Sequence, residues 1–145
     1  KNMKSKTGKI TIGIAKKDAS GKPIIYRFNY DNSPKSFQMF VDFHECAHHQ
    51  TGDLENINLP QNSKERILKE VIADCIAAIR IKSDHLNART LIKNTLIELK
   101  KAMTYIGFDE LAIKRREDNI LKCFNKNILL PNYIEDILKQ NKLQN

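Results

Sequence analysis

The sequence lacks the patterns that mark several classes of protein. It has no run approaching the roughly 18 consecutive apolar residues of a membrane-spanning helix, and it shows no secretory signal, internal repeat or low-complexity linker. None of its three cysteines belongs to a C-x-x-C pair, which argues against a structural zinc knuckle. With 145 residues, 41% of them apolar, the chain is most simply one domain, residues 1–145, with its own core.

Basic residues outnumber acidic ones, but they are not concentrated. The 25 basic and 17 acidic side chains give a formal net charge of +8, which would suit an acidic partner such as nucleic acid. The lysines are spread along the chain, however, and no aromatic-basic recognition motif accompanies them. Lys114-Arg115-Arg116 is the only tight cluster. We therefore expect no nucleic-acid partner. We attribute the charge to the many lysines of a chain that is generally rich in Lys, Asn and Ile.

The N-terminal part of the chain predicts a small sheet. Residues 9–15 alternate between apolar and polar positions, and residues 24–30 are rich in β-formers, so each stretch is expected to form a strand. Turn-forming residues at 18–23 connect the two, which predicts a β-hairpin. The next signal is Ser33-Pro34, which predicts a helix with Ser33 as its N-cap and Gly52 as its end.

Four further stretches predict helices, so the fold class is α+β. One helix is expected at 62–82, where Asn62 and Glu65 resemble a capping box, and another at 85–106. A third is expected to start after the capping residue Asp109, and a short amphipathic one to follow Pro131. Residues 1–8 and 141–145 are expected to be flexible tails. The predicted architecture is a small N-terminal hairpin or sheet followed by four to five helices.

The first predicted helix contains an H-E-x-x-H pentad, His44-Glu45-Cys46-Ala47-His48. Histidines four residues apart project from the same side of a helix. Here that side coincides with the apolar stripe, which points it into the protein. Such a pair can hold two corners of a tetrahedral Zn²⁺ site, and Glu45 can act on metal-bound water. The alternative is two hydrogen-bonded core histidines beside a glutamate of the helix surface.

The helix at 62–82 carries two carboxylates where burial is expected. It is apolar nearly all round, as a buried helix is, yet it contains Glu70 and Asp74 one turn apart. Buried carboxylates are unfavourable unless they are paired or bound to metal. We therefore expect Glu70 as the third zinc ligand, with water in the fourth position, and Asp74 as hydrogen-bond acceptor for a ligand histidine, His44 in the first place. Asp53 and Asp74 are the alternatives for the third ligand.

Together the two motifs resemble those of the gluzincin zinc metallopeptidases, the thermolysin-like group. The pentad is followed 22 residues later by Glu70-Val71-Ile72-Ala73-Asp74, which is similar to the E-x-x-x-D motif of that group. The chain also resembles small bacterial metallopeptidases that carry H-E-C-A/G-H and A-D-C, here Ala73-Asp74-Cys75. The extension typical of metzincins is absent, because Thr51 stands where they have glycine. The resemblance covers residues 37–81.

The resemblance implies a zinc-dependent hydrolase that cleaves peptide bonds in a peptide or protein substrate. Glu45 would be the general base that takes a proton from zinc-activated water and later delivers it to the leaving amine. The strand beside the active-site helix would bind extended peptide through its edge, and residues 24–30 are the candidate. The candidates for stabilising the oxyanion are His85 and Tyr105, against the alternatives of a loop histidine and a packed tyrosine.

The three cysteines indicate whether the protein works in an oxidising or a reducing compartment. Cys46 points about 200° away from His44 around the helix and is not expected to bind the same metal. Cys46 and Cys75 could meet where the two motif helices cross, as a disulfide in an oxidising compartment or as packed thiols in a reducing one, and we favour the bridge. Cys123 is expected to be a buried thiol. The chain starts at Lys1, as a trimmed form would, and a periplasmic or secreted location is expected, with the cytoplasm as the alternative.

The sequence therefore predicts an α+β zinc metallopeptidase whose helices surround the metal. The alternative function belongs to a different class: a binding or regulatory module that keeps the metal-binding fold but hydrolyses nothing. Cleavage specificity and oligomeric state are left open by the sequence.

Overall fold

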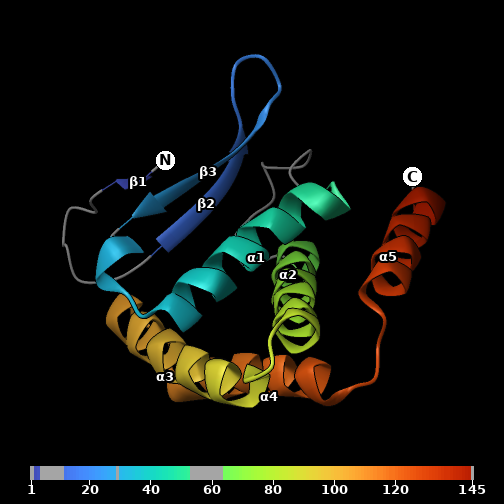
Figure 1. Cartoon of the computed structure of the whole chain (residues 1–145). Coiled ribbons are helices and arrows are strands. Elements are labelled where there is room, and N and C mark those ends of the chain that lie inside the picture. The colour runs from blue at the N-terminus through green and yellow to red at the C-terminus, as the bar shows by residue number, and fades with distance from the viewer. Residues whose placement is uncertain (1, 4–11, 29, 53–63, 145) are drawn as a thin grey trace.

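The computed structural model describes residues 2–3, 12–28, 30–52 and 64–144. Its strands are β1 (Asn2–Met3), β2 (Ile12–Lys17) and β3 (Pro23–Phe28), and a 3-10 turn follows at Tyr30–Asn32. The helices of the described chain are α1 (Lys35–Thr51), α2 (Lys64–Asp84), α3 (Ala88–Ile106), α4 (Glu110–Asn125) and α5 (Leu130–Gln144). This order, visible in Figure 1, confirms the predicted α+β class with a small N-terminal sheet followed by helices.

The sheet is built around β3. β2 runs antiparallel to β3, with Lys17 opposite Pro23, and β1 pairs in parallel with β3, with Asn2 opposite Arg27. The strand order is therefore β1-β3-β2, which places β2 at an edge. The sequence predicts only the β2–β3 hairpin, because a strand of two residues such as β1 is too short to show a periodic pattern.

The hairpin turn has the predicted chemistry. The Asp18 carboxylate accepts hydrogen bonds from the backbone N–H groups of Ser20 and Lys22, each at 2.9 Å. Gly21 adopts a φ of 82°, which side chains disfavour. β2 extends to Lys17, two residues beyond the predicted strand end. The first residues of that predicted strand, 9–11, lie outside the described residues.

The start of α1 differs from the prediction. Pro34, with φ −57° and ψ 148°, is the capping residue, so it is not yet helical, and no side chain caps the helix. The predicted N-cap, Ser33, lies one residue further out, where its carbonyl oxygen accepts a hydrogen bond from Nε2 of Gln38 at 2.9 Å. The predicted end is confirmed, because Gly52 has a φ of 70° and its N–H bonds back to the last turn.

The other predicted helices are present with shifted ends. α2 continues to Asp84, and its expected capping box at Asn62 lies outside the described residues. Asp109 caps α4 as predicted, accepting a hydrogen bond from the N–H of Ala112 at 2.8 Å. The sequence predicts a flexible tail from residue 141, but α5 continues to Gln144. An ion pair one turn apart, Lys139 to Glu135, lies on the preceding turns of this helix. Residues 1, 4–8 and 145 of the expected tails lie outside the described residues.

Two apolar clusters hold the helices around α2. The larger cluster joins α1, α2, α3 and α4, and its largest members include Phe37, Phe40, Ile81, Ile92, Ile120 and Phe124. The smaller one joins Ala47 of α1 and Ala73 of α2 to Tyr133 of α5. Residues 73–79 of α2 are all buried, as the prediction of a helix apolar nearly all round requires. Figure 1 shows α1 between the sheet and the pair α3 and α4, with α5 beyond α2.

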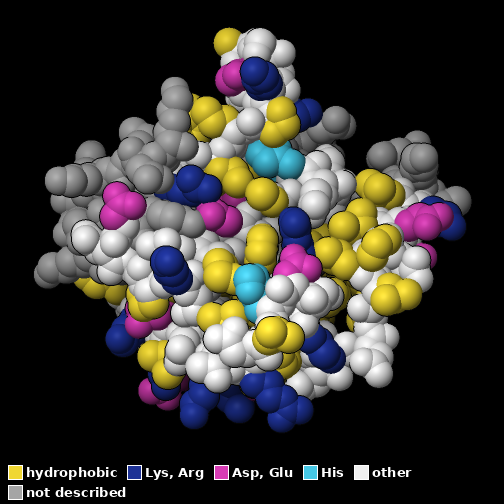
Figure 2. All heavy atoms as spheres, viewed as in Figure 1, with side chains coloured by type: hydrophobic (Ala, Val, Ile, Leu, Met, Phe, Trp, Pro, Cys, Tyr) yellow, Lys and Arg dark blue, Asp and Glu magenta, His cyan; other side chains and the backbone are white. Residues whose placement is uncertain are grey.

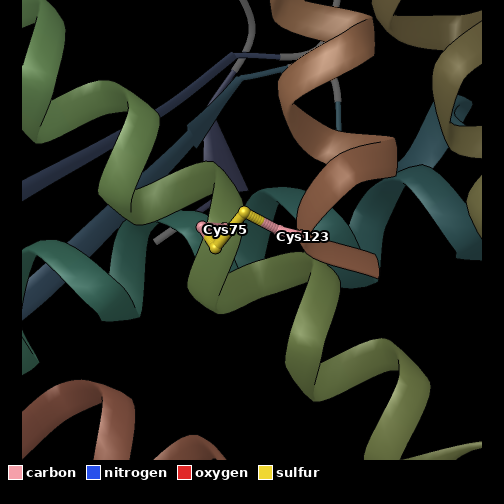
Figure 3. Close-up of a disulfide and its surroundings, with 2 residues drawn as sticks. All are labelled: Cys75 and Cys123. Carbon is pink, nitrogen blue, oxygen red and sulfur yellow. A yellow bond between two sulfur atoms is a disulfide. The ribbon is translucent and has the colours of Figure 1, made fainter. Parts of the chain in front are cut away.

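The disulfide differs from the predicted one. Cys75 of α2 is bonded to Cys123 of α4, as Figure 3 shows, with Cα atoms 5.3 Å apart, and Cys46 is a free, half-buried thiol. The predicted Cys46–Cys75 bridge and free Cys123 are therefore wrong. The reason is the direction of Cys75: Ala73 packs with Ala47 of α1, and a residue two positions further along a helix points about 200° away.

None of the described helices combines the length and the apolar character needed to cross a membrane. Figure 2 shows one face of the molecule, on which charged and hydrophobic side chains are interspersed. Lys and Arg side chains gather most along its lower edge, where Figure 1 places α3 and α4.

Candidate metal centre

Three predicted ligands meet between α1 and α2. His44 and His48 lie one turn apart on α1, and their Nε2 atoms are 3.2 Å apart. Glu70 on α2 has one carboxylate oxygen 2.9 Å from Nε2 of His44 and the other 3.4 Å from Nε2 of His48. The potential ligand atoms all lie within 4.8 Å of one another, so this group could hold a metal ion.

The group is enclosed by protein at the histidines and open at the glutamate. His44 and His48 are buried, whereas the Glu70 side chain is 48% exposed. Catalytic zinc sites use three protein ligands and leave a position for water, while structural sites are closed by four. Among the described residues three donors converge, and the exposed side of Glu70 leaves the group accessible to solvent. Asp53, the competing third ligand, lies outside the described residues.

Asp74 lies behind His44, on the side of the ring away from the other ligands. Its Oδ1 accepts a hydrogen bond from Nδ1–H of His44 at 2.7 Å, and its side chain is almost fully buried. This bond orients the ring and leaves Nε2 to face His48 and Glu70. Asp74 thus accepts the predicted hydrogen bond from His44, and it does not belong to the group whose atoms converge.

Arg116 is the site residue that sequence reasoning misses. Its Nε donates to Oδ2 of Asp74 at 2.8 Å and its Nη2 to Oδ1 at 2.9 Å, a two-pronged grip. In the sequence it is noted only as a member of the tight basic cluster Lys114-Arg115-Arg116 and is given no role at the site. A signal does exist, because Arg116 lies between Ile113 and Ile120 at spacings of three and four, within the apolar stripe of α4. A cation at such a position requires a buried partner.

Opposite charges within this group stabilise one another. Burial lowers the pKa of His44, but the carboxylates of Asp74 and Glu70 outweigh it and raise that pKa to about 9. Burial raises the pKa of Glu70, but the two histidines hold it well below its usual range. The pKa of Asp74 is likewise held low, because Arg116 and His44 outweigh the effect of burial. At neutral pH, His44 therefore carries a proton that a metal cation would replace.

Glu45 faces both the centre and the sheet. Its Oε1 is 3.9 Å from Nε2 of His44, and its Oε2 accepts a hydrogen bond from the backbone N–H of Ala15 at 2.9 Å. The residue is buried, which does not fit a glutamate of the helix surface. Gly13 allows the close approach of β2, since a Cβ there would lie 2.7 Å from Cγ of Glu45 and from Cγ1 of Val41.

The strand beside the centre is β2, not the predicted segment 24–30, most of which forms β3. β3 is the central strand and β2 is at the edge. The N–H of Ala15 points away from β3 and meets Glu45, so the outer edge of β2 borders the centre. β2 pairs with β3 along its whole length, and β1 pairs on the other side with Arg27 and Phe28, an arrangement that local sequence patterns do not encode.

The candidates for stabilising an oxyanion are not brought to the centre by any described contact. His85 lies between α2 and α3, fifteen residues after Glu70, which corresponds to about 22 Å along a helix axis. Tyr105 lies in the last turn of α3 and is 48% exposed. The neighbouring His49 is half-buried, and its Nε2 donates to the carbonyl oxygen of Ile24 at 3.2 Å.

Comparisons of the chain with models of protein families, with curated proteins and with solved structures found no match. The centre itself combines two histidines and a carboxylate in one group with a buried glutamate beside it.

Proposed function

We propose that this protein is a zinc-dependent metallopeptidase whose Zn²⁺ is held by His44, His48 and Glu70. The convergence of their ligand atoms within 4.8 Å carries the proposal. Two histidines and one glutamate form the donor set of several zinc peptidases. Magnesium and calcium prefer all-oxygen ligands, and copper(I) and iron–sulfur clusters prefer sulfur. The exposed side of Glu70 supports a position for water or substrate.

Glu45 is the residue best placed to move protons at this centre. Zinc bound there would supply the Lewis acidity that polarises a carbonyl and lowers the pKa of a water to about 7. The hydrogen bond from Ala15 holds Oε2 of Glu45, while Oε1 is the oxygen nearer to His44. Glu45 would accept the proton of the attacking water and deliver it to the leaving amine.

An extended peptide is the substrate class that the sheet favours. β2 lies at the edge of the sheet, and an extended segment can pair with such an edge through backbone hydrogen bonds. The N–H of Ala15 is bonded to Glu45, so a peptide would pair with the part of the edge beside that bond. A peptide paired along β2 would carry its backbone carbonyls past the proposed base.

The Cys75–Cys123 disulfide supports an oxidising compartment for this activity. Structural disulfides persist in periplasmic and secreted proteins and are rare in the cytosol. A periplasmic or secreted peptidase is therefore the form of the proposal that we favour.

The test compares two variants with a matched control. Glu45→Gln should keep one zinc per chain, measured by atomic absorption, and lose at least about 100-fold of the hydrolysis of a broad peptide library, because a general base contributes that much. His48→Ala should lose both zinc and hydrolysis. His49→Ala should keep both, since its ring bonds to the sheet. Undiminished hydrolysis by Glu45→Gln would refute the proposed mechanism.

A metal-binding module without hydrolysis is the second candidate. It is favoured by the lack of any described contact between the centre and His85 or Tyr105, since peptide hydrolysis needs a donor for the oxyanion. Wild-type protein that holds one zinc per chain but cleaves no peptide of the library would establish this function. Glu45→Gln would then leave zinc content unchanged and have no activity to lose.

A further inference from the structure

The link between Arg116 and Asp74 joins two helices directly behind a ligand. Arg116 of α4 binds both carboxylate oxygens of Asp74 of α2, at 2.8 and 2.9 Å. The Asp74 side chain is 3% exposed and that of Arg116 is 30% exposed. Arginine stays charged in proteins and offers its donors in a fixed planar fork. A carboxylate held by both prongs therefore has little freedom to rotate.

One oxygen of this carboxylate connects Arg116 to the metal centre. Oδ1 of Asp74 accepts both from Nη2 of Arg116, at 2.9 Å, and from Nδ1 of His44, at 2.7 Å. The plane in which Arg116 holds the carboxylate therefore sets the direction in which Oδ1 meets His44. That direction in turn determines where the Nε2 lone pair of His44 points.

We propose that Arg116 is a positioning residue of the metal centre, which orients His44 through Asp74. The proposal rests on the proposed function, because it assigns Arg116 a role in the same zinc site. Arg116 is not one of the three proposed ligands. It fixes Asp74, and Asp74 fixes the ring orientation and tautomer of the ligand.

The disulfide explains how α4 can be held so accurately. Cys75 directly follows Asp74, and its partner Cys123 comes seven residues after Arg116. Seven residues make about two helical turns, so Arg116 and Cys123 project from the same side of α4. The covalent and ionic links thus fasten α4 to consecutive residues of α2. Because the disulfide keeps the helices together, a change at Arg116 alters mainly the orientation of Asp74.

The experiment measures zinc affinity by competition with a chromogenic chelator in wild type, Arg116→Met and Arg116→Lys. Removing a group that supports a metal ligand weakens metal binding by about 10- to 100-fold. We expect Arg116→Met to fall in this range and Arg116→Lys to lie between it and wild type, since lysine keeps the charge without the fork. The exposed neighbour Arg115 provides the control, and Arg115→Met should bind zinc as wild type does.

A spectroscopic signature separates orientation of His44 from general bracing of α4. In zinc-loaded protein with ¹⁵N-labelled histidine, the Nδ1 proton of His44 should give a hydrogen-bonded, slowly exchanging NMR signal. We expect this signal in wild type and in Arg115→Met. In Arg116→Met and Arg116→Lys we expect the proton to exchange rapidly with water, so that the signal is lost. A purely structural brace would lower the melting temperature but leave the signal and the zinc affinity in place.

The outcomes separate this proposal from the one on which it rests. Unchanged zinc affinity with a retained His44 signal in either folded Arg116 variant would overturn the positioning role and leave the peptidase proposal standing. If Arg116→Met does not fold, Arg116→Lys decides by the same two measurements. Wild-type protein that binds no zinc would overturn both proposals. Zinc binding without hydrolysis would contradict the peptidase alone.

Discussion

At the residue scale, the proposed base depends on a neighbour that has no side chain. Gly13→Ala would place a Cβ 2.7 Å from Cγ of Glu45 and 2.7 Å from Cγ1 of Val41, closer than real contacts allow. Overpacking of this kind destabilises a protein by about 1–3 kcal/mol, and displacement of a catalytic group by an ångström can lower the rate on the order of 100-fold. Urea denaturation should show the loss of stability, and an assay of peptide hydrolysis should show the loss of rate. The zinc content should stay unchanged.

The control for this prediction lies on the same strand. Ile14 follows Gly13, so its side chain points to the opposite face of the sheet, where it is 37% exposed. Ile14→Ala should therefore leave hydrolysis unchanged. A Gly13→Ala protein with wild-type stability and rate would show that β2 moves freely relative to Glu45 and that the base does not require a glycine beside it.

The site residues differ in how far the sequence reveals them. His44 and His48 are found from a spacing of four within one helix, and Glu70 and Asp74 from carboxylates one turn apart in an apolar helix. Their identification needs only local periodicity. Arg116, by contrast, is 42 residues away from its partner along the chain. No local pattern states which buried carboxylate a distant arginine will meet, so its role becomes visible only when α4 is packed on α2.

At the element scale, the disulfide should be a main source of stability for the α2–α4 contact. Cys75 and Cys123 are 48 residues apart in sequence, and closing a loop of that length is expected to stabilise the fold by about 4 kcal/mol. Reduction should lower the free energy of unfolding by a comparable amount. Urea denaturation with and without reductant measures the difference. A Cys46→Ser variant should show the same difference, because Cys46 is a free thiol.

An equal midpoint in both redox states would mean that the two cysteines are not bonded in solution. A loss of the reductant effect in Cys46→Ser would instead indicate a bridge through Cys46. Either result would contradict the pairing in Figure 3.

The difference between the predicted and the observed disulfide shows why the sequence predicts the helices better than the contacts between them. Periodicity within α1 and α2 identifies both helices, but the partner of Cys75 depends on which side of α2 faces α4.

The sheet shows the same limit for strands. The hairpin follows from β-formers and turn residues, both local signals, and it is present as predicted. Which strand lies at the edge depends on β1, which joins from the start of the chain. The edge that we propose for peptide binding can therefore be assigned to β2 only in the folded molecule. The N-cap of α1 is a smaller case, since Pro34 has extended backbone angles and takes the capping position that the pattern assigns to Ser33.

At the scale of the whole molecule, the candidate metal centre lies where strand β2 and helices α1, α2 and α4 meet. α1 and α2 supply the proposed ligands, β2 bonds to Glu45, and α4 supplies Arg116. The fold class is predictable because it follows from the order of local elements. The meeting of these elements at one point cannot be predicted in this way, because it arises from long-range packing in the cluster that joins α1, α2, α3 and α4.

A metal bound at this junction should stabilise the entire fold. Zinc that binds only the folded protein adds about 4 kcal/mol at a free concentration 1,000 times its dissociation constant, and for a chain of this size that corresponds to a rise in Tm on the order of 10 °C. Differential scanning calorimetry with a chelator and with buffered zinc measures the shift. His48→Ala should abolish it, and Glu45→Gln should retain it, because Glu45 is no ligand. Wild-type protein whose Tm does not respond to zinc would contradict the metal centre, whereas a response that survives His48→Ala would place the metal elsewhere.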